Sequence, residues 1–290
     1  MRRIAQRIIL PVAAVGLLWS CTARRPAPSG GGLRVASLAP NLTEIVCALG
    51  GEKLLVGRSS ACNHPPEIVA RVPVVGDFGA PSIERLLAAQ PTLVLEVDLA
   101  DESIGGQIDR LGIRRLRVAC RGLYDIPEAI RQVGGAMGLE DRAGPLADEL
   151  ERQIAALRRE SAALTNRPAV FVEIWGDPLT TAGKGSFVSD LVYLAGGRNI
   201  ADEAGTDYFQ VSPEWVVARN PEVMLCLYMA DKTDTRQQVL TRPGWAGVTA
   251  VRTGRVRGGL NNDLLLRPGP RVLEGVRALR AAIGAPGQTP

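Results

Sequence analysis

The stretch SIERLLAAQPTLVL (82–95) returns as SPEWVVARNPEVML at 212–225. Aligned without a gap, both copies read serine, any residue, glutamate, any residue, two aliphatic residues and alanine, then a proline and an apolar run. Serine is a favoured helix N-cap, and a short apolar run after a proline is typical of a buried strand. Each copy therefore predicts a short capped helix that leads into a strand, with a glutamate fixed in its first turn.

A second pair of segments repeats in the same order along the chain. TEIVCALGG (43–51) matches SDLVYLAGG (189–197) in its hydroxyl, acidic, aliphatic and closing glycine positions. Glycines directly after a helix are typical of a left-handed C-terminal cap. One repeat could arise by chance, because capped amphipathic helices resemble one another. Two repeats in the same order indicate two related, pseudo-symmetric lobes.

Apolar runs alternate with helical patterns around both repeats, which predicts α/β layers with mainly parallel sheets. Strands are expected at 33–39, 54–60, 72–76, 92–97, 114–120, 169–175 and 222–228. Helices are expected at 41–51, 82–90, 102–111, 126–137, 187–197 and 268–284. Nothing breaks a helix from Pro145 to about Leu164. This long hydrophilic helix predicts a rigid strut between two lobes; an ordinary surface helix of one domain is the alternative.

The first residues read as a targeting segment. A basic start, MRRIAQR, precedes the short apolar run IILPVAAVGLLWS, which is typical of a secretory signal peptide over 1–20. Cys21 follows in the manner of a bacterial lipobox, although Trp19 is unusual there, so plain cleavage stays open. Residues 21–32 are rich in Pro, Gly and Ser and predict a lipid-anchored flexible tether. We expect the mature protein in the periplasm or on the outer face of the cytoplasmic membrane.

Beyond the tether, we expect an N-terminal lobe over 33–142, a linker helix over 143–167 and a C-terminal lobe over 168–290. The formal charge of +4 falls to about +1 once the three arginines of the signal leave. No basic cluster with interleaved aromatic residues stands out, so nucleic-acid binding is disfavoured.

Enzyme chemistry has no visible site in the sequence. The single histidine, His64, would have to serve any Ser-His or Cys-His arrangement, and no nucleophile elbow accompanies it. One histidine also disfavours a multi-histidine metal centre. GDPLTTAGKGS (176–186) lacks the spacing of a phosphate-binding loop. A binding protein is favoured, and an extracellular α/β enzyme is the alternative from another class.

Several aromatic residues lie at strand ends or in loops. They are Phe78, Trp175, Tyr208 and Phe209. The carboxyl ends of strands line the usual ligand crevice of α/β sheets, and rigid aromatic rings there can hold a flat or bulky ligand by stacking. For each ring taken singly, core packing is the alternative; Phe78 and Tyr208 are the exceptions, because their neighbours are polar or glycine.

The chain resembles the helical-backbone, class III periplasmic binding proteins. The segments that carry the resemblance are 34–68, 81–95, 178–200, 210–225 and 267–276. Such proteins serve ABC importers of vitamin B12, haem and ferric siderophores, and the resemblance is strongest to the cobalamin-binding members. It implies two α/β lobes joined by one long rigid helix, with the ligand in a cleft between the lobes. It also implies delivery to an ABC permease dimer with its ATPase subunits. We expect a monomer without a catalytic cofactor.

The resemblance assigns a role to the repeated glutamates. In this family, one glutamate on each lobe docks into arginine pockets of the permease, and Glu84 and Glu214 match those positions. A helix-stabilising carboxylate in the first turn is the simpler alternative for either residue alone. It does not explain why the two are matched across the lobes.

The carry-over to a cobalamin pocket is mixed. Phe78 and Tyr208 match positions of ring-contacting aromatic residues, whereas Ala61 and Thr180 stand where aromatic residues are expected. Compensating or additional contacts are expected from Trp175, His64, Phe209 and Arg267. His64 as an axial cobalt ligand is a further hypothesis; no other metal site is expected.

The ligand could instead be haem or a ferric siderophore. A siderophore site should use several arginines, for which Arg58, Arg121, Arg257 and Arg267 are candidates.

Among the cysteines, Cys47 and Cys226 are expected as buried thiols. Cys62 and Cys120 both follow first-lobe strands at the same end of the sheet. They could form a disulfide in an oxidising compartment.

Overall fold

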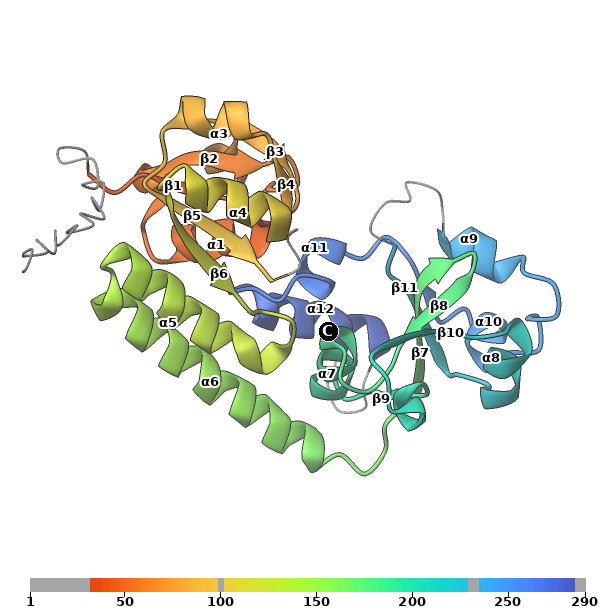
Figure 1. The fold of residues 1–290 in the computed structure, drawn as a ribbon. Helices are drawn as coiled ribbons and strands as arrows, with labels where there is room; N and C mark the ends of the chain where they lie inside the picture. The colour runs from red at the N-terminus through yellow and green to blue at the C-terminus, as the bar shows by residue number, and fades with distance from the viewer. Residues whose placement is uncertain (1–31, 99–101, 229–234, 285–290) are drawn as a thin grey trace, which may run out of the picture. The chain divides into compact units, whose positions relative to one another are not determined.

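The computed structural model describes residues 32–98, 102–228 and 235–284, which form two α/β lobes (Figure 1). The predicted signal peptide, the lipidation site at Cys21 and most of the tether lie outside these residues. None of the helices in the described ranges is long and apolar enough to cross a membrane.

The first lobe is built round a six-stranded sheet of order β4-β3-β2-β1-β5-β6. Its strands are β1 (Val35–Ser37), β2 (Leu55–Ser59), β3 (Val74–Asp77), β4 (Ala80–Pro81), β5 (Leu93–Val97) and β6 (Arg114–Val118). Its helices are α1 (Pro40–Ala48), α2 (Pro66–Val69), α3 (Ile83–Ala89), α4 (Glu102–Arg110) and α5 (Ile126–Met137), with short 3₁₀ turns η1 (Glu52–Leu54) and η2 (Leu123–Asp125). All strand pairs are parallel except the β3–β4 hairpin. The predicted parallel α/β layer is confirmed here.

The second lobe has a sheet of order β10-β8-β7-β11-β12, with β9 paired to β7. Its strands are β7 (Ala169–Gly176), β8 (Leu179–Ala182), β9 (Arg198–Asn199), β10 (Tyr208–Gln210), β11 (Val223–Cys226) and β12 (Val256–Arg257). Its helices are α7 (Phe187–Leu194), α8 (Pro213–Arg219), α9 (Thr235–Leu240), α10 (Thr249–Arg252), α11 (Asn262–Leu265) and α12 (Val272–Ile283), with the 3₁₀ turn η3 (Asp202–Ala204). The sheet is mixed, because β8 runs antiparallel to both β7 and β10.

The repeated phrase folds in the same way in both lobes, as α3 leading to β5 and α8 leading to β11. The Ser82 hydroxyl accepts from the Arg85 N–H at 3.3 Å, and the Ser212 hydroxyl accepts from the Trp215 N–H at 3.2 Å. Both helices end on a residue in the left-handed region, Gln90 and Asn220. These two are the non-glycine residues with positive φ in the described part of the chain. The same cap and the same stop support two related lobes.

The glycine pairs of the second repeat close α1 and α7 with identical hydrogen bonds. The Gly51 N–H donates to Val46 O and the Gly197 N–H to Val192 O, each at 2.9 Å. Gly50 has φ 69° and Gly196 φ 90°, so both occupy the left-handed position that disfavours a side chain. The predicted left-handed caps are confirmed.

The long helix is α6 (Glu140–Ala162), which is about 35 Å long at the usual rise per residue. It begins five residues before Pro145, which lies inside the helix rather than at its start. Its first half packs closely on α5, where Gly134 leaves room for Ala143. Its last turn is tied to α7 of the second lobe, because the Ser161 hydroxyl donates to Leu194 O at 2.9 Å.

A second connection ties the segment around α11 and the start of α12 to the first lobe. Arg271 donates to both carboxylate oxygens of the buried Glu44 at 2.8 and 2.9 Å. The Asn41 amide and the Cys120 thiol both donate to Pro268 O. The helix predicted over 268–284 therefore starts only at Val272. Prolines disfavour a helix in the residues before it, and residues 268–271 form hydrogen bonds with α1 instead.

Candidate functional site

Glu84 and Glu214 occupy the same place on matched helices. Each is the second residue of its helix, directly after the capping turn, and each is exposed. Neither carboxylate has an ion-pair partner within the described residues. The backbone N–H of Glu214 and the Ser212 hydroxyl hold the pKa of the Glu214 carboxyl below its usual value. Both side chains thus lie on the surface without an ion-pair partner in the described residues.

An exposed aromatic face lies on β7, β8 and β10 of the second lobe. Thr180 pairs directly with Trp175 on one side and with Gln210 on the other. Tyr208, two residues before Gln210, shares its face of the sheet. Trp175 is 45% exposed and Tyr208 46% exposed, so both rings face solvent. The structure therefore brings together Trp175, Thr180 and Tyr208, which we call the aromatic face.

Trp175 is held in place by a buried polar network behind it. Its indole N–H donates to Asp177 O at 2.7 Å, and its ring lies 6.3 Å from that of Tyr228. The Tyr228 hydroxyl donates to the buried Glu173, which also accepts two hydrogen bonds from Arg242 at 2.8 and 2.9 Å. Burial and Glu173 raise the pKa of Tyr228, so its hydroxyl keeps its proton. The exposed indole is thus ordered before any ligand arrives.

Phe209 does not join this face. It alternates with Tyr208 and Gln210 along β10, so it points to the opposite side of the sheet. There its ring meets Trp215 of α8 edge-on at 6.1 Å. Tyr208 and Phe209 are adjacent in sequence, but the ring of Tyr208 is exposed and the ring of Phe209 packs on α8.

In the first lobe, hydrogen bonds connect the loop after β2 with the end of β3, next to the predicted ligand residues Ala61 and Phe78. The Ser60 hydroxyl donates to Asp77 Oδ1 at 2.6 Å, and the Ser60 N–H donates to Gly76 O at 2.8 Å. This brings Ala61, next to Ser60, close to Phe78, which lies at the tip of the β3–β4 hairpin. The Phe78 side chain is 46% exposed. The small residue Ala61 and the exposed ring of Phe78 therefore each follow directly on a residue of the Ser60–Asp77 hydrogen bond.

Arg267 comes to this first-lobe surface from the far end of the chain. It donates to Asn63 Oδ1 at 2.7 Å and to Ala61 O at 3.5 Å, and it forms an ion pair with Asp263 at 2.7 Å. The Asn63 amide donates in turn to Asp263 Oδ2 at 2.6 Å. His64 is the next residue in this half-exposed loop. We call Ala61, His64, Phe78 and Arg267 the loop surface.

Sequence reasoning missed Asn63, Asp263 and Tyr228. Asp263 and Arg267 are four residues apart, a spacing that predicts an ion pair, because such residues are neighbours on a helix. Tyr228 and Asn63 carried no signal, because their roles depend on partners more than 30 residues away in the sequence.

The candidate arginines of a siderophore site are already engaged. Arg58 donates to four backbone carbonyls, those of Ser59, Cys62, Val69 and Val72. Arg257 donates to Ala282 O and Gly254 O, and Arg121 is paired with Asp98. With Arg267 bound to Asp263, each of the four candidates has a structural partner.

Cys62 and Cys120 are free thiols in the structure, so the possible disulfide between them is not formed. Cys62 Sγ lies 3.1 Å from Thr43 Oγ1 and 3.2 Å from Ser59 Oγ, while the Cys120 thiol bonds to Pro268 O. Burial raises the pKa of Cys120 to about 12. Cys226 is buried as expected, whereas Cys47 is only partly buried, with a pKa raised by burial to about 11.

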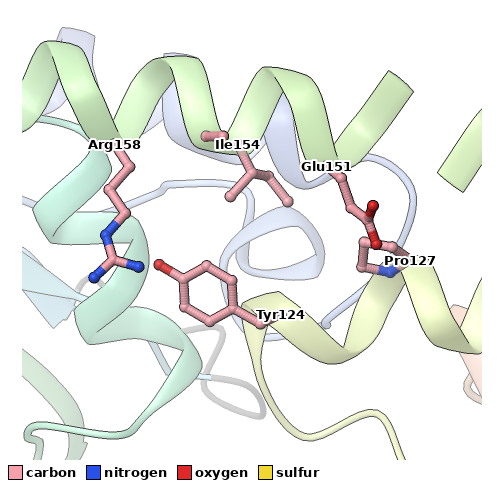
Figure 2. A pocket seen from close by; sticks show the side chains of 6 residues that line it. Tyr124, Pro127, Glu151, Ile154 and Arg158 are labelled. Carbon is pink, nitrogen blue, oxygen red and sulfur yellow. The ribbon is translucent and has the colours of Figure 1, made fainter. Parts of the chain in front are cut away.

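A separate pocket of about 350 Å³ lies along α6, beside η2 and the start of α5 (Figure 2). Tyr124 and Arg158 face each other across it, with the guanidinium carbon 5.7 Å from the ring centre. None of the residues predicted to bind a ligand lines it. In the described ranges, no cluster of three or more His, Cys, Asp and Glu side chains could hold a metal ion.

A profile of the periplasmic binding protein family matches residues 35–259. The two lobes with their mostly parallel sheets also match the fold of solved class III members. The chain therefore belongs to the class III periplasmic binding protein family.

Relatives make the class more specific. An uncharacterized ABC transporter substrate-binding lipoprotein of Bacillus subtilis, YvrC, is 29% identical over 86% of this chain and 79% of its own length. A vitamin B12-binding protein of Pectobacterium atrosepticum is 29% identical over 87% of this chain and 88% of its own. The apo structure of the periplasmic heme-binding protein RhuT from Roseiflexus sp. RS-1 is 32% identical, with a TM-score of 0.77, covering 87% of this chain and 100% of its own. The chain is the substrate-binding protein of an ABC transporter, in a family of transport proteins rather than enzymes.

Proposed function

We propose that this protein captures a corrinoid, with cobalamin as the leading candidate, between the aromatic face and the loop surface. A corrin ring is broad and flat, with polar amide side chains at its edge. Exposed, pre-ordered aromatic rings suit the ring, and polar groups such as the exposed side chain of Asn63 suit the edge. The observation that carries the proposal is the position of Trp175 directly opposite Thr180.

Trp175 supplies the aromatic ring that Thr180 lacks. The resemblance led us to expect an aromatic residue at position 180, and the register places the Trp175 indole on the same face, one strand away. Among the three candidates for compensation, Phe209 points to the other side of the sheet and His64 lies in the other lobe. We infer that the ligand ring moves toward β7 relative to a site with an aromatic residue on β8.

Haem is the second candidate ligand. The likeness to a heme-binding protein in both fold and sequence favours it, and Tyr208 and His64 are side chains able to bind iron. A ferric siderophore has less support, because the four arginines that would recognise it already serve structural partners.

Delivery would occur through the two matched glutamates. Glu84 and Glu214 are exposed, free of ion pairs within the described residues, and fixed by identical caps, so each can form a charge-assisted pair with an arginine of the permease. We further propose that the protein is monomeric and anchored through a lipid on Cys21 outside the cytoplasmic membrane.

Calorimetric titration of cyanocobalamin into the Trp175→Ala variant tests the ligand site. Loss of one stacked, half-exposed ring should raise the dissociation constant roughly ten-fold or more. Tyr124→Ala is the matched control, because Tyr124 is 52% exposed but lies in the separate pocket along α6. Equal affinities of wild type and Trp175→Ala would remove Trp175 from the site.

A further inference from the structure

The helices α3 and α8 share more than their capping serines and glutamates. Leu87 and Val217 lie three residues after Glu84 and Glu214, and both are exposed, at 46% and 38%. Ala88 and Ala218, four residues after the glutamates, are exposed as well. Residues three and four apart are neighbours on a helix surface. Each helix therefore presents a carboxylate beside a small apolar patch.

The exposure of Leu87 and Val217 is a property of the folded helices. The preceding residues, Leu86 and Val216, are fully buried and fix both helices on their sheets. Large exposed apolar side chains are few in the described part of the chain: Phe78, Leu87, Leu111, Tyr124, Trp175, Tyr208 and Val217. Three of them belong to the aromatic face or the loop surface. Two more occupy the same position of the repeat, in different lobes, which a random scatter of surface residues would not produce.

We propose that Leu87 with Ala88, and Val217 with Ala218, are the apolar halves of two equivalent docking faces for the membrane subunits of the transporter. The inference rests on the proposed function, in which Glu84 and Glu214 dock on the permease, and adds the residues that make each contact dry. At each face the partner presents a cation next to a shallow apolar hollow. Exclusion of water by the apolar patch strengthens the charge pair beside it.

The same pattern on both faces identifies the kind of partner. Two equivalent faces require a partner with two equivalent surfaces, as a dimer of like subunits provides. A second copy of this chain does not fit, because each face carries an unpaired carboxylate and two such faces would repel. The small alanines allow the backbone of the partner to approach closely.

The test first identifies the ABC transporter of the source organism that binds the wild-type protein, and places it in nanodiscs. Binding of three variants to that transporter is then compared. Leu87→Ser/Val217→Ser removes both apolar patches, and Glu84→Arg/Glu214→Arg reverses both charges. Leu111→Ser is the matched control, because Leu111 is an aliphatic residue of similar exposure, 41%, in the turn directly after α4. Surface plasmon resonance gives the dissociation constant, and thermal melting confirms that each variant is folded.

We expect Leu87→Ser/Val217→Ser to raise the dissociation constant roughly ten-fold, from the apolar area no longer buried, and Leu111→Ser to leave it unchanged. The charge-reversed variant should not bind measurably. If charge reversal abolishes binding while the serine variant binds like wild type, the apolar faces are refuted and glutamate docking stands. If charge reversal has no effect either, docking through these helices is refuted as a whole. An equal loss in Leu111→Ser would also overturn the inference, because the effect would then not be local.

Discussion

At the scale of single residues, the second repeat places an acid at the same position in each lobe with opposite consequences. Glu44 on α1 is buried and accepts hydrogen bonds from Nε and Nη2 of Arg271. Asp190 on α7 has no such arginine, and burial together with the nearby Asp202 raises the pKa of its carboxyl to about 6. The positive charge of Arg158 only partly opposes this rise in pKa. The lobes thus share a sequence position but not its electrostatics.

Asp190→Asn should therefore stabilise the protein at neutral pH. A folded-state pKa raised above the unfolded value means that the folded protein binds more protons between about pH 4 and 6, so the free energy of unfolding falls as pH rises through that window. Removing the charge should add about 1–2 kcal/mol at pH 7 and nothing below pH 4. Urea unfolding at several pH values measures this.

Glu44→Gln is the matched control, and its effect should have the opposite sign. It leaves Arg271 largely buried without its carboxylate, which should cost about 3 kcal/mol at pH 7. Two variants with the same sign would show that the environments of the two acids do not differ as described.

At the scale of elements, the sequence was sufficient where local signals agree. Both ends of α3 and α8 are predicted to within one residue. The signals are the serine cap, the pattern of apolar residues and the proline that follows each helix. The sequence was insufficient for β8 and β10, which have four and three residues and therefore too little pattern to separate from loops. The separation of Tyr208 from Phe209, and the pairing of Trp175 with Thr180, depend on those strands. The matched positions of Glu84 and Glu214 were therefore predictable, whereas the composition of the aromatic face required strand register.

The two helix stops provide a prediction at this scale. Gln90 adopts the left-handed region, and its side chain makes no hydrogen bond within the described residues, so Gln90→Gly should raise the free energy of unfolding by about 0.5–1 kcal/mol. Asn220 tolerates that region better, and its side-chain oxygen accepts from the Thr249 N–H at 2.8 Å. Asn220→Gly should therefore be neutral or destabilising. Chemical unfolding of both variants distinguishes these outcomes, and equal stabilisation by both would contradict the assigned role of the Asn220 side chain.

At the scale of the whole molecule, five of the seven large exposed apolar side chains in the described residues fall on surfaces with a proposed function. Phe78, Trp175 and Tyr208 belong to the surfaces proposed for the ligand, while Leu87 and Val217 belong to the helices proposed for the permease. The lobes are joined by α6 and by the segment that binds α1 through Arg271. The contact between Phe209 and Trp215 places α8, one of the two helices proposed for docking, behind the aromatic face. The surfaces proposed for ligand capture and for delivery thus lie on two sides of the second-lobe sheet.

Equilibrium dialysis of the purified protein against cyanocobalamin, with haemin in parallel, tests the central claim most directly. We expect about one equivalent of cyanocobalamin to be retained with submicromolar affinity, together with quenching of tryptophan fluorescence by the corrin ring next to Trp175. Retention of haemin at one equivalent with no retention of cyanocobalamin would contradict the corrinoid assignment. Retention of neither would contradict a site for flat, ring-shaped ligands between the aromatic face and the loop surface.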